Sequence, residues 1–118
     1  MKRAARASER SLAREAEGLF AALADRTRLE ILSRLTHGEI CAGEIAKRFR
    51  ISRPAVSRHV RVLRRARLVR ERRQGRNLYY TLNVEPLGVV DRWLDQYRAE
   101  WHTRLARLKQ HAESGVNQ

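Results

Sequence analysis

Hydrophobic residues recur at intervals of three and four positions in five stretches of the chain, which is the spacing of one face of an α-helix. The region between the fourth and fifth stretches instead contains alternating apolar and polar residues, as a β-strand does. The pattern predicts a mainly α-helical protein with one small β-hairpin. The predicted helices span about 11–24, 26–37, 41–49, 52–66 and 86–112, and the hairpin spans about 68–82.

Side chains at two expected helix starts support these boundaries. Asp25 and Ser52 each precede a helical pattern, and their oxygens can accept backbone N–H groups that the first turn of a helix leaves unpaired. Pro54 falls in the first turn of the fourth helix, where its missing N–H costs nothing. Arg50 occupies the turn before this helix, where glycine is often preferred.

The hairpin is expected to consist of two strands, from Leu68 to Arg73 and from Leu78 to Leu82, around a loop at 74–77. Gly75 in this loop can adopt the positive φ that a tight turn requires. Arginines surround the tip of the hairpin, namely Arg72, Arg73 and Arg76.

The length and composition bound the domain organisation. The chain has 118 residues, of which 42% are hydrophobic, enough for one domain with a core. We expect this domain to span 11–112, between a flexible basic N-terminus at 1–10 and a flexible tail at 113–118. No uninterrupted apolar stretch is long enough to span a bilayer, so we expect a soluble protein of the cytoplasm, associated with the nucleoid.

The positive charge is concentrated in one segment. Residues 47–76 carry thirteen Lys and Arg residues and one acid, whereas the other 88 residues are almost neutral. Such a segment favours a polyanionic partner, because cations that neutralise phosphates release condensed counterions. A membrane surface is the rival polyanion, but the basic fourth helix lacks the adjacent exposed apolar stripe that membrane binding needs. Nucleic acid is therefore the expected partner.

Two short helices joined by a tight turn and followed by a basic hairpin are typical of a winged helix-turn-helix. The second helix of this motif enters the major groove of double-stranded DNA, where Arg53 and Arg58 can donate to guanine and Ser57 can donate or accept. The arginines of the hairpin, or wing, suit the adjacent minor groove or phosphates. Arg61, Arg64 and Arg65 lie further along the helix and are expected to contact phosphate or solvent.

The chain resembles the ArsR-type (ArsR/SmtB) family of bacterial winged-helix transcriptional repressors. The resemblance rests on ALADRTRLEILSRL from Ala22, on GEICAGEIAKRFRISRPAVSRHVRVLRRARLV from Gly38 and on RRQGRNLYYTLN from Arg72. It implies a homodimer formed by the first and last helices, which binds an inverted repeat in its own or a neighbouring promoter until an unknown inducer releases it. The implied DNA contacts are Ser52, Arg53, Ser57, Arg58, His59, Arg73, Arg76 and Asn77, to which Arg61 and Arg64 add phosphate contacts. The expected dimer interface comprises Leu12, Leu19, Leu94, Tyr97, Trp101, Leu105 and Leu108.

The two metal sites common in this family are absent from the sequence. Cys41 is followed by Ala42 and Gly43, so the Cys-x-Cys pair of an arsenic-type site is missing. The last helix lacks the Asp-x-His and His-x-x-Glu or His-x-x-His pairs of the other site. We therefore expect no metal and no cofactor.

Several alternatives remain open at this stage. His59 contacts DNA or packs, partly buried, against the third helix. Cys41 is a packing residue or a redox switch, and the stripe of Trp93, Tyr97 and Trp101 is dimer core or the lining of a ligand pocket. A nonspecific nucleic-acid-binding module is a further alternative, whereas no catalytic pattern of residues indicates an enzyme.

Overall fold

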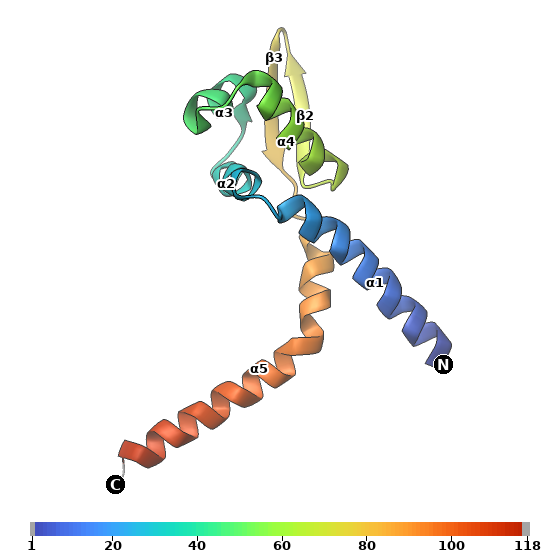
Figure 1. The fold of residues 1–118 in the computed structure, drawn as a ribbon, viewed down its shortest axis with the longest axis vertical. Helices are drawn as coiled ribbons and strands as arrows, with labels where there is room; N and C mark the ends of the chain where they lie inside the picture. The colour runs from blue at the N-terminus through green and yellow to red at the C-terminus, as the bar shows by residue number, and fades with distance from the viewer. Residues whose placement is uncertain (1, 117–118) are drawn as a thin grey trace.

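The computed structural model describes residues 2–116 and contains five helices and a three-stranded sheet. Figure 1 shows the sheet and the three middle helices at one end of the molecule, from which the first and last helices lead away in different directions. The helices are α1 (Lys2–Leu23), α2 (Arg26–Leu35), α3 (Ala42–Phe49), α4 (Arg53–Arg65) and α5 (Leu87–Val116), and the strands are β1 (Ile40–Cys41), β2 (Val69–Gln74) and β3 (Asn77–Leu82).

Helix α1 is longer than its apolar pattern predicts. Residues 2–10, which we expected to be flexible, are helical, so the predicted start at residue 11 is wrong. This segment is rich in alanine and arginine, which favour helix, but it has no apolar stripe that would reveal it. Further along, Ala16, Leu19 and Ala22 are buried where α1 meets the other helices.

The helix caps predicted from the sequence are present. The backbone N–H of Arg28 donates to Asp25 Oδ1 over 3.0 Å, and that of Ala55 donates to Ser52 Oγ over 3.2 Å. These bonds fix the starts of α2 and α4. On α2, Leu29 is 48% exposed, whereas Ile31 is buried.

The hairpin prediction is confirmed, but the sheet has a third strand. Strand β3 lies between β2 and β1, and both pairings are antiparallel. Gly75, at φ +62°, forms the tight turn between β2 and β3. Strand β1 contains only two residues, too few for an alternating pattern, and is therefore not predicted from the sequence.

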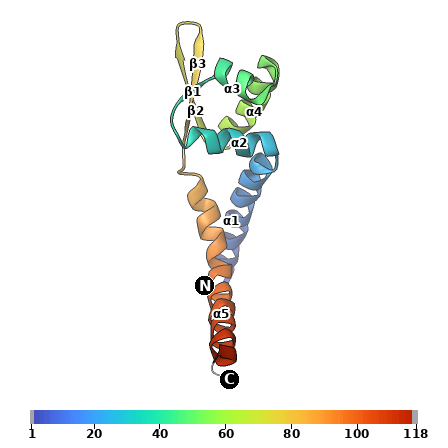
Figure 2. The same cartoon turned by 90° about the vertical axis from the view of Figure 1, so that its left-hand side faces the viewer.

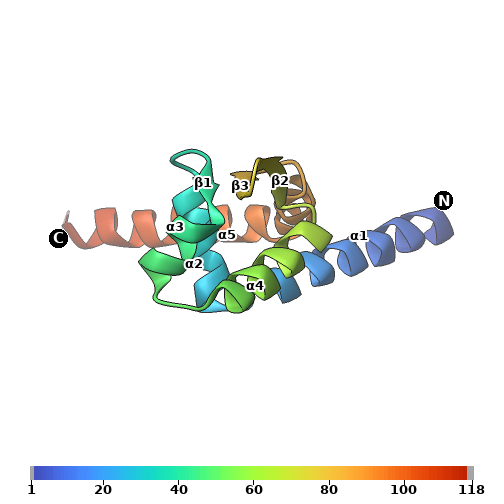
Figure 3. The ribbon, with the colours of Figure 1, turned by 90° about the horizontal axis from the view of Figure 1, so that it is seen from above.

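Helices α2, α3 and α4 lie beside the sheet (Figures 2 and 3), and one apolar core joins α1–α4 to it. Its most deeply buried large side chains are Ile31, Ile45, Val56, Leu63 and Leu68. Leu68 directly follows the turn after α4 and anchors the first residues of the wing to this core. The position of the wing relative to α4 is therefore set by apolar packing at its base.

Helix α5 leaves the core soon after it begins. Its first turns pack against α1, where Phe20 and Trp93 meet edge to face with ring centroids 5.2 Å apart. Every residue from Leu94 to Gly115 is exposed, and in Figure 1 this part of α5 leads away from the other elements. The helix continues past the expected end at residue 112, and residues 117–118 of the expected tail lie outside the described part of the chain. Within residues 2–116 no helix is long and apolar enough to cross a membrane.

Candidate nucleic-acid interface

Helix α4 has one buried apolar face and one exposed polar face. Val56, Val60 and Leu63 are buried in the core. Because these residues recur at three- and four-residue spacing, they form one face of the helix, and the side chains on the opposite face are directed outward. Of the residues predicted to contact DNA, the exposed ones on or next to this helix are Ser52, Arg53, Ser57, Arg58, Arg61 and Arg64.

The N-terminal end of α4 is shaped by contacts with α3. A β-carbon at Gly43 would lie only 3.0 Å from Arg53 Nη1, so the guanidinium of Arg53 lies close over the first turn of α3. Ser52 uses one lone pair to cap α4, and its hydroxyl hydrogen remains free to donate. Arg58 makes no ion pair within the described residues. Arg58 is therefore available to a ligand.

The structure places the partly buried side chain of His59 beside Asp25 at the start of α2. Its side chain is 23% exposed, and Nδ1 lies 3.9 Å from Oδ1 of Asp25. The Arg28 backbone N–H is the main reason that the pKa of Asp25 lies below its usual value, and His59 and the Arg28 cation act in the same direction. His59 thus contacts the N-terminal cap of α2, and little of its ring faces solvent.

Arg64 is paired with an acid from the wing. Its Nη1 lies 2.9 Å from Oε2 of Glu71 on β2, and the side chain is half exposed. Arg61, one turn earlier on α4, has no such partner within residues 2–116. Of the two arginines expected to contact phosphate, Arg61 is the one whose charge is not already offset.

The wing carries both a fixed arginine and free polar side chains. Arg72 donates through Nε and Nη2 to the two carboxylate oxygens of Glu39 over 3.2 and 2.6 Å, and its guanidinium lies 4.7 Å from the centre of the Tyr79 ring. The donation from Arg72 holds the pKa of Glu39 below its usual value of 4.5. Arg73, Arg76 and Asn77 are exposed near the turn, as predicted.

Sequence reasoning missed the role of Glu39. It lies 33 residues before Arg72, in the turn preceding β1, and becomes its neighbour only because β1 pairs with β3. A lone glutamate between two helical patterns carries no local signal for such a contact. Glu39 therefore joins the site as the residue that anchors Arg72.

The expected dimer residues fall into two groups. Leu94, Tyr97, Trp101, Leu105 and Leu108 are all exposed on α5, and Leu12 on α1 is half-buried. Leu19 is only 6% exposed and belongs to the core of its own chain, so its assignment to the interface is corrected. The helical pattern could not make this distinction, because core and interface residues share one apolar stripe.

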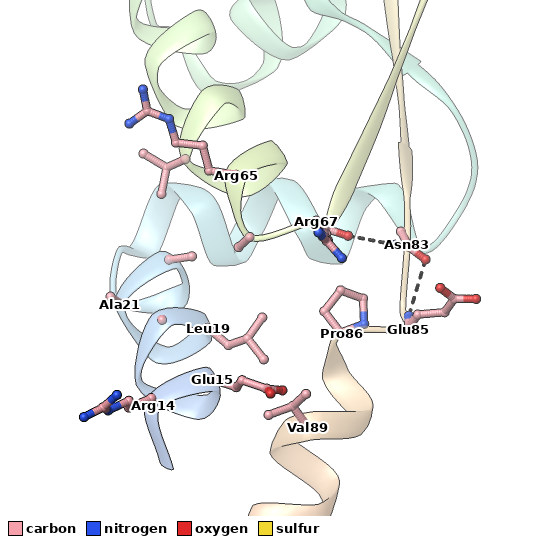
Figure 4. A pocket seen from close by; sticks show the side chains of 14 residues that line it. Arg14, Glu15, Leu19, Ala21, Arg65, Arg67, Asn83, Glu85, Pro86 and Val89 are labelled. Carbon is pink, nitrogen blue, oxygen red and sulfur yellow. Dashed lines mark hydrogen bonds between the residues drawn. The ribbon is translucent and has the colours of Figure 1, made fainter. Parts of the chain in front are cut away.

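Two cavities lie beside α1. One, of about 790 Å³, is bounded by α1, the end of α4 and the connection from β3 to α5; in Figure 4, Leu19, Pro86 and Val89 face it, whereas Arg14 points away. The other, of about 600 Å³, lies between α1 and α5 and is lined by Trp93 and Tyr97 together with arginines of both helices.

Cys41 and the acidic and histidine side chains are the potential metal ligands of the chain. Cys41 is half-buried at the start of α3, and its thiol makes no capping hydrogen bond. In the described part of the chain, no three His, Cys, Asp or Glu side chains are clustered so that they could hold a metal ion.

Comparison with known proteins identifies the family. The model described as "Bacterial regulatory protein, arsR family" matches residues 25–71. The HTH-type transcriptional regulator Rv2034 of Mycobacterium tuberculosis is 40% identical over 95 residues, which cover 80% of this chain and 89% of that protein. The transcriptional repressor SdpR of Bacillus subtilis is 38% identical over 76 residues, which cover 64% of this chain and 84% of that protein.

A solved structure agrees with the sequence matches. The ArsR-like transcriptional regulator from Rhodococcus sp. RHA1 superposes with a TM-score of 0.65 at 37% identity, and the match covers 83% of this chain and 92% of that one. The predicted winged helix-turn-helix fold is thereby confirmed. The chain belongs to the ArsR family of bacterial regulatory proteins and is a DNA-binding regulator of transcription.

Proposed function

We propose that the protein is a homodimeric repressor that binds an inverted repeat in double-stranded DNA, with its own upstream region as the first operator to test. The observation that carries this proposal is the exposed polar face of α4, on which Arg58 and Arg61 have no ion-pair partner within the described residues. A helix of this kind fits the major groove, and guanidinium groups can donate two hydrogen bonds to guanine.

The dimer is supported by α5. A row of large apolar side chains at heptad-like spacing is exposed along this helix, and a second copy of the same helix offers a matching surface. Two copies related by a two-fold axis would present two α4 helices to DNA, which matches an inverted repeat with half-sites about one helical turn apart. We propose that the protein acts in the cytoplasm, at the nucleoid, and without a metal.

The test is a fluorescence-anisotropy titration at about 150 mM salt against the upstream duplex and a scrambled duplex, because specific binding typically exceeds nonspecific binding by about a thousandfold or more. Arg58→Ala is expected to weaken binding to the operator by about 1–3 kcal/mol and to reduce sequence preference. Arg61→Ala, a matched change on the same helix at an arginine without an ion-pair partner in residues 2–116, is expected to weaken both duplexes alike. Equal affinity of the wild-type protein for both duplexes would reject this operator, and equal losses on both duplexes for Arg58→Ala would reject its base contact.

A second candidate function is the sensing of a small aromatic anion. The 600 Å³ cavity between α1 and α5 combines the rings of Trp93 and Tyr97 with the cations of Arg6, Arg10 and Arg92. Anilinonaphthalene sulfonate is a suitable probe, since it carries both an aromatic body and an anionic group. Sensing would be supported if the probe lowers the affinity of the protein for DNA and if Trp93→Ala weakens binding of the probe. If Trp93→Ala leaves binding of the probe unchanged, the probe binds elsewhere. The same titration with a thiol oxidant tests Cys41 as a switch.

A further inference from the structure

Within residues 2–116, two arginines occupy a backbone conformation that favours glycine. Arg50, after α3, has φ +53°, and Arg67, after α4, has φ +62°. Each ends its helix in the same way: the N–H of Ile51 donates to the Ala46 carbonyl over 3.1 Å, and that of Leu68 donates to the Leu63 carbonyl over 2.9 Å. Glycine is the usual residue in this geometry, because a β-carbon is strained in the left-handed region.

Local stability does not account for an arginine at position 50. A cation near the end of α3 is favoured by the helix dipole, but the last turn of α3 already carries Lys47 and Arg48. A further cation adds repulsion from Lys47, which has no ion-pair partner within residues 2–116, and keeps the backbone strain. Arg50 is also exposed and has neither an ion-pair nor a side-chain hydrogen-bond partner within residues 2–116.

The position of Arg50 indicates what it contacts. It lies in the turn between α3 and α4, two residues before the cap of α4 and at the same end of that helix as Arg53 and Ser57. When the N-terminal end of this helix enters the major groove, the turn before it meets the edge of the groove, which is formed by sugar and phosphate. Strained residues are often found at functional sites, and for Arg50 the strain coincides with a position at the edge of the groove.

We propose that Arg50 binds a backbone phosphate at the edge of the major groove and that this contact accounts for an arginine at a position that favours glycine. The proposal rests on the DNA binding of α4 described above, but it adds a residue outside the predicted contact set. Because phosphate is common to every sequence, the contact contributes to affinity and to register on the duplex but not to base preference.

Arg67 provides a matched control within the same protein. It shares with Arg50 the left-handed conformation, the exposed position and two basic residues in the preceding turn, here Arg64 and Arg65. It lies at the other end of α4, about 20 Å away for a helix of 13 residues at 1.5 Å each, beside the base of the wing. We therefore expect it to make no phosphate contact.

The experiment compares Arg50→Gly with Arg67→Gly in two measurements. Thermal unfolding is expected to give a Tm equal to or above that of the wild type for both variants, because glycine relieves the strain. The second measurement is the slope of log affinity against log salt on the upstream and scrambled duplexes. For Arg50→Gly, we expect this slope to fall by about 0.9 per protomer on both duplexes. For Arg67→Gly, we expect it to be unchanged. Arg50→Lys is expected to retain most of the slope, since it keeps the cation.

The possible outcomes separate the alternatives. A wild-type slope for Arg50→Gly, or the same loss for both glycine variants, overturns the proposal. A fall in Tm for Arg50→Gly without a change in slope assigns Arg50 to the stability of α3 and overturns it as well. The absence of operator preference in the wild-type protein would defeat the operator-specific function, but the comparison on the scrambled duplex would still decide the role of Arg50.

Discussion

The exposed apolar side chains of α5 lead to a direct prediction about assembly. Trp101 is the largest of them and is 61% exposed in the single chain. If α5 packs against a second copy, Trp101→Ala removes contact area from both sides of the two-fold axis at once. We expect this variant to be largely monomeric at concentrations where the wild-type protein is a dimer.

The magnitude follows from the exposed fraction of Trp101. An aromatic side chain buries about 150–250 Å², so a residue that is 61% exposed would lose roughly 100 Å² of interface when truncated to alanine. At about 25 cal/mol per Å² this is roughly 2.5 kcal/mol per protomer, or about 5 kcal/mol per dimer. Since about 1.4 kcal/mol corresponds to a factor of ten, the dimer dissociation constant should rise by three to four orders of magnitude.

Sedimentation equilibrium over a range of concentrations measures this constant. His102→Ala is the matched control, because His102 is also exposed but is directed about 100° around the helix from Trp101. A wild-type protein that remains monomeric at tens of micromolar, or a Trp101→Ala variant with the wild-type dissociation constant, would refute the assignment of this face. DNA affinity should decrease in parallel, because a monomer binds only one half-site.

Two further predictions concern stability. Ser52→Ala removes the acceptor that caps α4 and should cost about 1 kcal/mol in chemical denaturation, with Ser52→Thr restoring most of it; an unchanged midpoint for Ser52→Ala would show that the cap is dispensable. The pKa of Glu39 is lower in the folded state than its usual value of 4.5, so the unfolded chain binds more protons and stability should decrease as the pH falls from about 5 through the folded-state pKa. In thermal unfolding, Glu39→Gln should make this decrease in stability shallower but not abolish it, because the pKa of Asp25 is also lowered. A dependence of Tm on pH identical to that of the wild type would contradict the role assigned to the Arg72 contact.

The features predictable from the sequence were those with a repeating or local signal. The buried stripe of α4, its cap at Ser52 and the glycine turn of the wing each depend on neighbouring residues, and each is present in the structure. Strand β1 and the pairing of Glu39 with Arg72 were missed, because both depend on residues more than thirty positions apart. Periodicity also could not separate Leu19, in the core, from the exposed residues of α5.

Acidic residues neutralise only some of the cations in the basic segment at residues 47–76, and the remaining cations form its binding surface. Of its thirteen basic residues, Arg48, Arg64 and Arg72 pair with Glu44, Glu71 and Glu39, and the other ten form no ion pair within residues 2–116. The Arg64 and Arg72 pairs connect separate elements, so these two arginines contribute to the scaffold.

The salt dependence of DNA binding should reflect this division. Only cations that neutralise phosphate release counterions, with a slope of about 0.9 for each contact. The unpaired side chains at the start of α4 and at the wing tip should therefore determine the slope, together with Arg50. A slope per protomer that approaches the value for all thirteen cations would require the ion pairs of Arg48, Arg64 and Arg72 to open on binding. Such a slope would contradict a wing that is held rigidly by Glu39.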